Sequence, residues 1–394
     1  MRPAWFIALS LWGLGLAQPA QLGTRPFYLL DTLTPGPLHD RLAACAARTL
    51  VYPRSQLAIG HRGAALFFPE HTREGYLAAV RQGAGYVECD VVPTRDGALV
   101  CRHSEGDLAE TSNILSTPLA AKCRKPFRPG RKPDCRTTDL TLAEFLSLEG
   151  WPEGRNENAR KPEDYYRAAP DWRTLAYSPG AVMSHRGYIE LLKPTGVNFI
   201  PELKQVNLPP GMDLEKYRKQ IIDDYRAADV PPERVYLQSF SLEDIRFWRR
   251  YAPDYAKNAV WLDGRYKERG FDPSHPESLR PTMVELAAEG LRYLSPPLWV
   301  LLTLDDEGNI APSAYARAAR KAGLELIPWT LDRSGPLAGG GGWYYQSVAP
   351  AIHSNGDVYR ALDVLVNDIG VYAVFSDWPA TVAFFDRCGR QNAR

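Results

Sequence analysis

The sequence predicts an α/β fold in which helices cover a parallel β-sheet. Apolar strand-like segments alternate with helix-like segments along most of the chain, which is typical of parallel sheets. The length of 394 residues favours one barrel-sized domain with insertions, because (β/α)8 barrels range from about 200 to over 400 residues. Charged side chains close several strand-like segments, and ligands bind at these strand ends in barrels and in open α/β sheets.

The composition excludes some classes of partner. Hydrophobic residues make up 45% of the chain, and 47 basic against 46 acidic side chains leave a net charge of +1. This composition is typical of a globular domain and lacks the basic excess on which polyanion binding depends. We therefore expect no nucleic-acid partner.

The first 17 residues predict a secretory signal. Arg2 precedes an apolar run that closes on the small residues Gly15 and Ala17, so cleavage is expected after Ala17. A membrane anchor is the alternative, but the run is shorter than the roughly 20 residues that a spanning helix needs. No later segment is long and apolar enough to span a bilayer. We expect a secreted or periplasmic protein without stable membrane insertion.

The cysteines predict disulfides rather than a zinc site. An even number of cysteines in an exported protein favours disulfides, and none of these has metal-ligand spacing. Cys123 and Cys135 flank a loop rich in Pro and Arg, and they are the firmest pair. Six cysteines allow 15 connectivities, so the sequence does not fix the pairs; Cys89 with Cys101 and Cys45 with Cys388 would complete the set.

The regular elements start after a lead-in of residues 18–56, in which a short helix is expected near 38–49. The barrel is expected over 57–388, beginning with an apolar strand at 57–61 and a helix at 70–82. A second strand begins near Tyr86. Only twelve residues separate Asp90 from His103, which is too few for a helical crossover, and they include the turn signal Arg95-Asp96-Gly97. We expect a hairpin-like excursion there.

Residues 104–196 are the least regular part, and we expect an insertion over the mouth of the site with one clear helix at 142–148. The alternation then resumes, with strands at 197–204, 234–240, 258–262, 292–296, 324–330 and 371–377, and helices at 214–228, 242–251, 282–289, 313–322 and 357–368. This gives nine strand-like segments for a barrel that needs eight. One of them is therefore a hairpin partner or an edge piece.

Three carboxylates predict a metal site. Glu88 and Asp90 are two apart on one strand and so point to the same face, and Glu202 ends another strand. Carboxylates without Cys or His suit a hard cation, Ca²⁺ or Mg²⁺. The alternative is that each carboxylate forms a salt bridge, as Glu202 could with Lys204.

Two histidines at strand ends, His61 and His103, predict acid–base chemistry. One neutral and one protonated imidazole can cleave a phosphodiester or an ester, and Arg62 offers a fork suited to phosphate. A lone histidine at a strand end is more often structural. The remaining histidines have no such context and are expected to be structural: His39, His71, His185, His275 and His353.

These residues together resemble the glycerophosphodiester phosphodiesterase family over roughly residues 57–385. The resemblance is carried by an ordered set of motifs: His61-Arg62-Gly63, Pro69-Glu70-His71-Thr72, Glu88-Cys89-Asp90, Thr94-Arg95-Asp96-Gly97, His103, Glu202-Leu203-Lys204, Ser239-Phe240, Trp329-Thr330 and Ser376-Asp377-Trp378-Pro379. It implies a TIM barrel that hydrolyses glycerophosphodiesters, as small-molecule substrates, to sn-glycerol 3-phosphate and an alcohol.

The resemblance also implies roles for individual residues. It implies that Glu88, Asp90 and Glu202 bind the metal and that His61 and His103 are the base and the acid. Arg62 and Lys204 would bind the phosphate. Trp329 would form a wall of the glycerol pocket, and Glu70 would orient Arg62 or the metal site. The chain departs from the family pattern twice. His71 stands where the family usually has Asn, and Ser104 where it has Asp, which affects the contacts behind the site and the orientation of His103.

Two alternatives differ in activity. The first is a lipid phosphodiesterase of the phospholipase D or sphingomyelinase type, in which aromatic residues of the insertion would face lipid rather than form a small core: Trp151, Trp172, Tyr165, Tyr166 and Tyr177. The second is a non-catalytic exported binding protein. The presence of both histidines and all three carboxylates argues against that second alternative.

Overall fold

The computed structural model describes residues 19–391, so the expected signal sequence lies outside the described residues. Within this range, eight parallel strands follow the order β12-β9-β8-β7-β6-β2-β1-β13. Their bounds are β1 (Ser55–Gly60), β2 (Ala84–Pro93), β6 (Asn198–Leu203), β7 (Gln238–Ser239), β8 (Val260–Leu262), β9 (Tyr293–Ser295), β12 (Glu325–Leu326) and β13 (Val374–Ser376).

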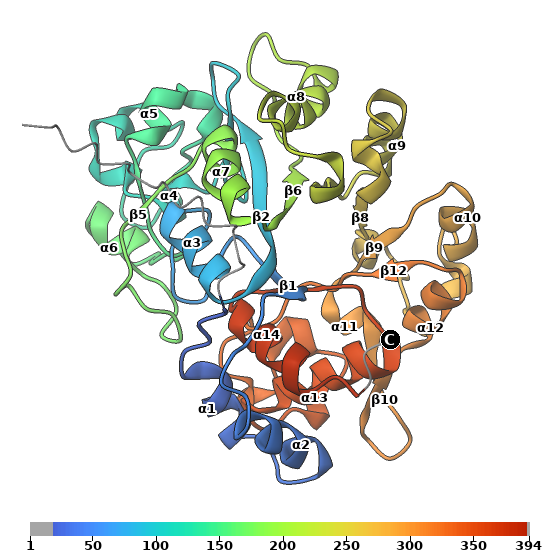
Figure 1. Ribbon diagram of the computed structural model, residues 1–394. Coiled ribbons are helices and arrows are strands. Elements are labelled where there is room, and N and C mark those ends of the chain that lie inside the picture. Colours follow the sequence, from blue (N-terminus) through green and yellow to red (C-terminus); the bar gives the residue numbers. More distant parts are fainter. Residues whose placement is uncertain (1–18, 392–394) are drawn as a thin grey trace, which may run out of the picture.

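The two outer strands of this order meet and close the sheet. The N–H of Tyr372 donates to the carbonyl of Leu326 (2.8 Å), and the N–H of Leu331 donates to the carbonyl of Phe375 (2.9 Å). These bonds connect β12 and the segment after it with β13 and the residue before it. The sheet therefore closes into a (β/α)8 barrel (Figure 1). The predicted TIM barrel is confirmed.

The ninth strand-like segment is a hairpin partner. Strand β3 (Leu99–Cys101) pairs antiparallel with β2, with Val91 opposite Cys101 and Pro93 opposite Leu99. Gly97 supplies the positive φ of +79° that the tight turn between them requires. The excursion expected between Asp90 and His103 is thus a β-hairpin that rises from the end of β2.

Helices surround the barrel, and the main hydrophobic core fills the space between them and the strands. They are α3 (Arg73–Arg81), α7 (His185–Leu192), α8 (Leu214–Ala227), α9 (Leu242–Tyr251), α10 (Met283–Ala288), α12 (Ala314–Lys321), α13 (Asp357–Asp363) and α14 (Pro379–Cys388). Between β9 and α12 the chain adds a short helix and a hairpin, namely α11 (Leu298–Leu301), β10 (Leu302–Leu304) and β11 (Ile310–Pro312).

Two of these helices differ from the sequence expectation. Helix α7 lies inside the range 104–196 that was expected to be irregular, and it buries His185, Tyr188, Ile189 and Leu192 at helical spacing. Helix α14 was not expected, because eight of its ten residues are buried and a helix covered on all sides shows no polar stripe. The regular fold therefore resumes at α7.

The lead-in covers the side of the barrel where the chain ends. Helices α1 (Arg25–Asp31) and α2 (Pro37–Ala46) pack against α14 (Figure 1, blue beside red). Cys45 of α2 is bonded to Cys388 of α14. All six cysteines lie in the described residues, and their other bonds are Cys89–Cys101 and Cys123–Cys135. The three pairs are the expected ones.

The insertion between β3 and α7 forms a small core of its own. Its elements are α4 (Leu108–Thr111), α5 (Leu142–Leu146), α6 (Pro162–Tyr166), β4 (Glu149–Gly150) and β5 (Gly180–Ala181). Trp151, Tyr165 and Tyr166 are buried in this core, so they do not form a lipid-facing surface. Tyr177 is 51% exposed and stacks on Phe68 of the barrel. No helix within residues 19–391 has the length and apolar character to cross a membrane.

Tyrosines fill the barrel at the N-terminal ends of its strands. Tyr86, Tyr236 and Tyr293 belong to a separate interior cluster, against which Tyr372 packs. The hydroxyl of Tyr86 donates to that of Tyr372 (3.2 Å), and the Tyr236 and Tyr372 hydroxyls lie 2.9 Å apart. This tyrosine plug leaves the opposite end of the barrel, where His61 follows β1, for the site.

Candidate active site

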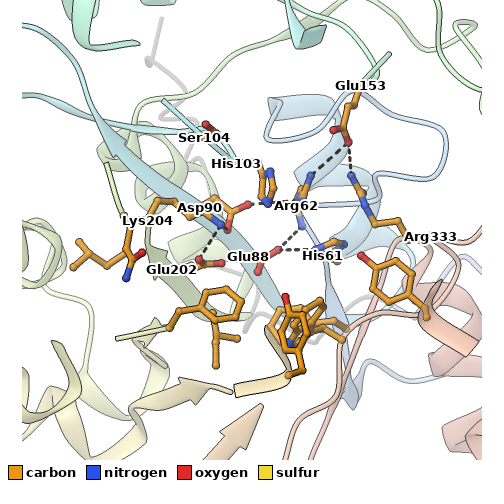
Figure 2. A pocket seen from close by; sticks show the side chains of 18 of the residues that line it. His61, Arg62, Glu88, Asp90, His103, Ser104, Glu153, Glu202, Lys204 and Arg333 are labelled. Atoms are coloured by element: carbon orange, nitrogen blue, oxygen red, sulfur yellow. Dashed lines mark hydrogen bonds and ion pairs between the residues drawn. The ribbon is translucent and has the colours of Figure 1, made fainter. Parts of the chain in front are cut away.

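A pocket of about 740 Å³ opens at the C-terminal ends of the strands (Figure 2). All but one of the residues with a predicted role line this pocket. They are His61, Arg62, Glu88, Asp90, His103, Glu202, Lys204 and Trp329. The exception is Glu70, which is fully buried and bonded to the side chain of Arg62. Residues that are far apart in the sequence are thus gathered in one place.

The three carboxylates converge because β2 and β6 are neighbours in parallel register, with Asp90 opposite Glu202. Oxygens of Glu88, Asp90 and Glu202 all lie within 4.8 Å of one another. Gln238 of β7 donates its side-chain N–H to Oε1 of Glu88 (2.9 Å) and so fixes that carboxylate from the next strand.

Burial and the proximity of these carboxylates shift their pKa values. Burial, reinforced by the negative charges of Asp90 and Glu202, raises the pKa of Glu88 well above its ordinary value. Burial also raises the pKa of Glu202, to about 7, although Lys204 counteracts it. Lys204 Nζ lies 2.8 Å from Glu202 and 3.8 Å from Asp90, and the guanidinium Nε of Arg62 lies 3.5 Å from Asp90. The salt bridge that was the alternative for Glu202 therefore exists. Lys204 and Arg62, the latter also paired with Glu70, still face three carboxylates, so the cluster keeps an excess of negative charge.

The donor set fits a hard divalent cation. Oδ1 of Asp90 is buried and makes no hydrogen bond among the described residues, because Lys204 Nζ stays 3.8 Å away. A buried carboxylate oxygen without a hydrogen bond is costly unless a bound cation contacts it. Carboxylate oxygens are the ligands that Ca²⁺ and Mg²⁺ prefer. The cluster can therefore hold either ion.

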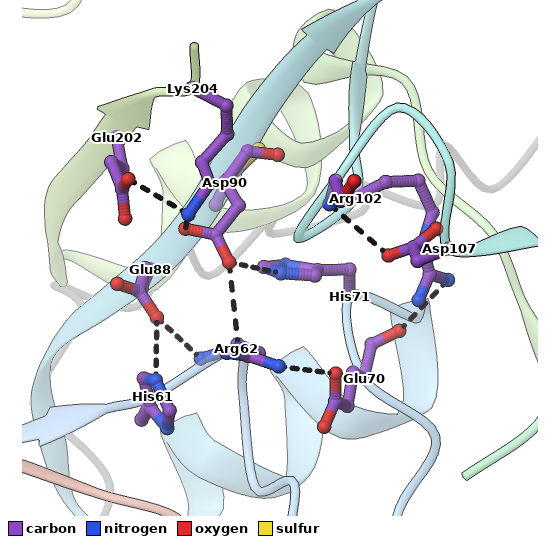
Figure 3. A network of polar contacts seen from close by, with 12 residues as sticks. His61, Arg62, Glu70, His71, Glu88, Asp90, Arg102, Asp107, Glu202 and Lys204 are labelled. Atoms are coloured by element: carbon purple, nitrogen blue, oxygen red, sulfur yellow. Dashed lines mark hydrogen bonds and ion pairs between the residues drawn. The ribbon is translucent and has the colours of Figure 1, made fainter. Parts of the chain in front are cut away.

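His61 is oriented by Asp377, to which the sequence assigned no role. Its Nδ1 lies 2.5 Å from Oδ1 of Asp377. Its Nε2 lies 3.8 Å from Oε2 of Glu88 (Figure 3). Burial alone would raise the pKa of Asp377, but Arg333 and His61 lower it to about 2, so the carboxylate is ionised and accepts the Nδ1–H. Burial also lowers the pKa of His61. Nε2 is therefore unprotonated and can accept a proton in the pocket.

His103 follows the hairpin strand β3 and lines the pocket. Burial lowers its pKa well below the ordinary value, and the positive charges of Arg62 and Lys204 lower it further. An anion bound near Arg62 and Lys204 would offset both charges. His103 can therefore gain a proton when an anionic ligand is present.

Arg62 is held by three carboxylates (Figure 3). It adopts a positive φ of +56°, which turns its backbone N–H toward Oε2 of Glu88 (2.9 Å). Its Nη1 donates to Glu70 (2.8 Å), and its Nε lies 3.5 Å from Asp90. The guanidinium is thus fixed beside the carboxylate cluster, in the pocket.

His71 contacts the site although it was expected to be structural. Its Nε2 lies 2.9 Å from Oδ2 of Asp90, and its Nδ1 lies 3.0 Å from the hydroxyl of Tyr76. Burial lowers the pKa of His71 to about 4, so the ring is neutral, with Nε2–H donating to Asp90 and Nδ1 accepting from Tyr76. The only signal in the sequence was its place beside Glu70 in the second motif.

Arginines from two irregular segments complete the polar network. Arg333 follows β12, and Arg173 belongs to the insertion; both contact Glu70 and Asp377. Glu153 of the insertion lies 2.6 Å from Arg333 and 3.8 Å from Arg62, on the side of the pocket away from Lys204 (Figure 2). Sequence reasoning missed these three residues because no periodic pattern marks the segments that carry them.

Aromatic rings form the other wall of the pocket. Trp329 stacks on Trp343 with ring centroids 5.8 Å apart, and Tyr266 packs edge-on against both. Trp343 lies in a glycine-rich loop and is 43% exposed. Lys267 lies over the ring of Phe240 (4.9 Å) at the same wall. The pocket thus offers a charged side for an anion and an aromatic side for the groups attached to it.

Comparisons with known proteins point to one family. The model of the glycerophosphoryl diester phosphodiesterase family matches residues 61–381. A glycerophosphodiester phosphodiesterase of Arabidopsis thaliana is 34% identical over 343 residues, which cover 82% of this chain and 84% of that protein. An Arthroderma benhamiae protein described as extracellular is 45% identical over 248 residues, covering 60% of this chain and 98% of its own.

A solved structure from Silicibacter pomeroyi, described as a candidate glycerophosphoryl diester phosphodiesterase, superposes with a TM-score of 0.54 at 18% identity. The superposition covers 85% of this chain and 95% of the other. At this identity the likeness concerns the fold, which is the same barrel.

Proposed function

Because the chain belongs to the glycerophosphoryl diester phosphodiesterase family and has that family's phosphodiesterase activity, we propose that it cleaves glycerophosphodiesters to sn-glycerol 3-phosphate and an alcohol by acid–base catalysis at a metal site. The observation that carries the proposal is the meeting of three carboxylates and two imidazoles around one pocket. His61 and His103 are the base and the acid of this proposal.

Glu88, Asp90 and Glu202 would hold the divalent cation, Ca²⁺ or Mg²⁺. The lack of a hydrogen bond to Oδ1 of Asp90 among the described residues and the mutual repulsion that raises the pKa of Glu88 support this assignment. A cation bound there supplies a Lewis acid that offsets the negative charge on the phosphoryl oxygens. Arg62 and Lys204 both line the pocket beside Asp90 and would bind those oxygens as well.

His61 acts as the general base. Its Nε2 takes the proton from the oxygen that attacks phosphorus, while Nδ1–H remains bonded to Asp377. That oxygen belongs either to water, which gives sn-glycerol 3-phosphate directly, or to the neighbouring glycerol hydroxyl, which gives a cyclic phosphate that water then opens. The ionised Asp377 stabilises the imidazolium that forms, because opposite charges 2.5 Å apart in a buried setting attract strongly. Asp377 thus fixes the tautomer that base catalysis needs.

His103 acts as the general acid. The bound diester's negative charge offsets that of Arg62 and Lys204, which lets His103 carry a proton in the complex. It gives this proton to the oxygen of the leaving alcohol as the bond from phosphorus to that oxygen breaks. Trp329 and its aromatic neighbours would form the wall against which the glycerol packs.

Hydrolysis of glycerophosphocholine tests the proposal. The purified protein should release sn-glycerol 3-phosphate, and His61→Ala and His103→Ala should each lower kcat by roughly 100- to 10,000-fold, the usual contribution of a general acid or base. Faster hydrolysis of micellar lysophosphatidylcholine or sphingomyelin than of the soluble diester would contradict it in favour of a lipid phosphodiesterase.

Metal dependence has a readout besides activity. Ca²⁺ or Mg²⁺ added after EDTA treatment should restore activity and raise the Tm of the wild type, because a ligand that binds only the folded state stabilises it. Glu202→Gln should lose that rise in Tm. An activity that EDTA leaves unchanged would contradict the metal site.

Export from the cytoplasm is part of the proposal. The described residues contain three disulfides, which persist in oxidising compartments, and the Arthroderma benhamiae relative is described as extracellular. Expression in the native host should yield protein outside the cytoplasm whose N-terminus is Gln18. A retained Met1 on a cytoplasmic protein would contradict the signal sequence.

A further inference from the structure

Two arginines from distant segments hold the same two buried carboxylates. Arg333 donates to Oε1 of Glu70 (2.6 Å) and to Oδ2 of Asp377 (2.9 Å). Arg173 donates to the same two oxygens, at 3.3 and 3.5 Å. Both carboxylates are fully buried, so the pair of guanidiniums neutralises charges that water does not reach.

The second oxygen of each carboxylate contacts a residue of the catalytic pocket. Oε2 of Glu70 accepts from Arg62 (2.8 Å), and Oδ1 of Asp377 accepts from the ring of His61 (2.5 Å). The orientation of each carboxylate therefore determines where Arg62 and His61 point. The arginine pair fixes that orientation from behind.

The two arginines differ in what they face. Arg333 lines the pocket and also contacts Glu153, so it can meet a ligand directly. Arg173 does not line the pocket, and its side chain is only 3% exposed. Any effect of Arg173 on the reaction is therefore transmitted through Glu70 and Asp377.

The segment that carries Arg173 is anchored on the loop that carries Arg333. Trp172 packs so closely against Gly335 that a Cβ at that glycine would lie 2.9 Å from the indole. Gly335 also has a φ of +74°, a backbone conformation that residues other than glycine rarely adopt. The guanidinium of Arg173 lies 5.0 Å from the centre of the Trp172 ring, which holds it between the two carboxylates.

We propose that Arg173 is a positioning residue for the reaction, through which the insertion completes the active site instead of merely covering it. The proposal rests on the base role proposed for His61. Arg173 fixes Asp377 and Glu70, and these fix His61 and Arg62. When Arg173 is removed, Arg333 still bonds both carboxylates and Arg62 still pairs with Glu70, so the fold is kept while the orientation of the carboxylates loosens.

Steady-state kinetics of Arg173→Ala test this inference, with glycerophosphocholine as substrate. We expect kcat to fall roughly 10- to 100-fold, the usual effect of removing a group that orients a catalytic residue. KM should stay within about 2-fold because Arg173 does not face the pocket. Millimolar guanidinium should restore part of kcat by entering the vacated site.

Arg124→Ala is the matched control, since Arg124 belongs to the same insertion but contacts Asp139 and is 46% exposed. It should keep the wild-type kcat and show no response to guanidinium. If Arg173→Ala does not fold, Arg173→Lys tests the inference instead. The lysine ammonium cannot bond both carboxylates as the guanidinium fork does, so this variant should lower kcat at least about 3-fold.

A wild-type kcat in folded Arg173→Ala, or in Arg173→Lys where only that variant folds, would overturn the inference while the proposed function stands. A loss of kcat that guanidinium fails to reverse and that Arg124→Ala shares would also overturn it. A wild-type protein that hydrolyses no glycerophosphodiester would overturn the proposed function, and this inference with it.

Discussion

His61 and Asp377 form a buried hydrogen-bonded pair, Nδ1 to Oδ1 at 2.5 Å, across the contact between β1 and β13. Gly60 and Ser376 are register partners in these parallel strands, so the residues that follow each of them meet at the strand ends. The pair is therefore produced by the closure of the barrel, although its members are 316 positions apart in the sequence.

Replacing Asp377 by Asn should nearly abolish activity. The amide can donate to Nδ1 of His61, which places the ring proton on Nε2 and removes the base, and in a comparable catalytic pair this change lowers kcat about 10,000-fold. We expect kcat for glycerophosphocholine to fall at least about 100-fold. Asp386→Asn is the control, since Asp386 pairs with Ser55 and Arg390 and does not line the pocket. Equal kcat in the two variants would contradict the tautomer argument.

The same carboxylate should make stability depend on acid pH. The pKa of Asp377 is about 2 in the folded protein against an ordinary value of 3.8, so its stabilisation is present above about pH 4 and is lost as the pH falls toward 2. The difference corresponds to about 2 kcal/mol. Urea unfolding should show the gap between wild type and Asp377→Asn shrinking by that amount between pH 5 and pH 2. A gap that is constant with pH would show that Asp377 keeps an ordinary pKa.

Two disulfides of equal span should differ in their effect on activity. Cys89–Cys101 and Cys123–Cys135 each close a sequence separation of 12 residues, so removing either should cost about 3 kcal/mol of unfolding free energy. Cys89 lies between Glu88 and Asp90, however, and Cys101 leads to His103. Only Cys89→Ala/Cys101→Ala should lower kcat at a temperature where both double variants are folded. Equal kcat in both would show that the hairpin holds His103 without its bond.

The aromatic wall should affect substrate binding more than stability. Trp343 is 43% exposed, so Trp343→Ala should change the Tm little, whereas lost ring contacts of about 0.5–1.5 kcal/mol should raise KM roughly 2- to 10-fold. Tyr177→Ala is the control, because Tyr177 is 51% exposed but lies outside the pocket. A KM that rises equally in both variants would indicate a general loosening of the pocket mouth.

The barrel and the central carboxylates could be predicted because their signals are local. Alternating apolar segments indicate a parallel sheet, and a spacing of two places Glu88 and Asp90 on one face of a strand. Since parallel strands end at one edge, Glu202 and His61 were expected there too. The short sequence separation between Asp90 and His103 also predicted the hairpin.

The residues that hold these groups could not be predicted, because their partners are set by closure and docking. Asp377 acquires its partner only when β13 meets β1, and Arg173 acquires its partners only when Trp172 docks on Gly335. Nothing near His71 in the sequence shows that its ring reaches Asp90. Helix α7 has helical spacing, but the Pro- and Asn-rich segments before it obscured where the regular fold resumes.

The tyrosine plug closes one end of the barrel, so the active-site pocket has a single opening at the other end. With Tyr86, Tyr236, Tyr293 and Tyr372 packed into its floor, whatever enters must leave by the way it came. A departing product therefore occupies the pocket opening through which the next substrate molecule must enter, so product release and substrate entry compete.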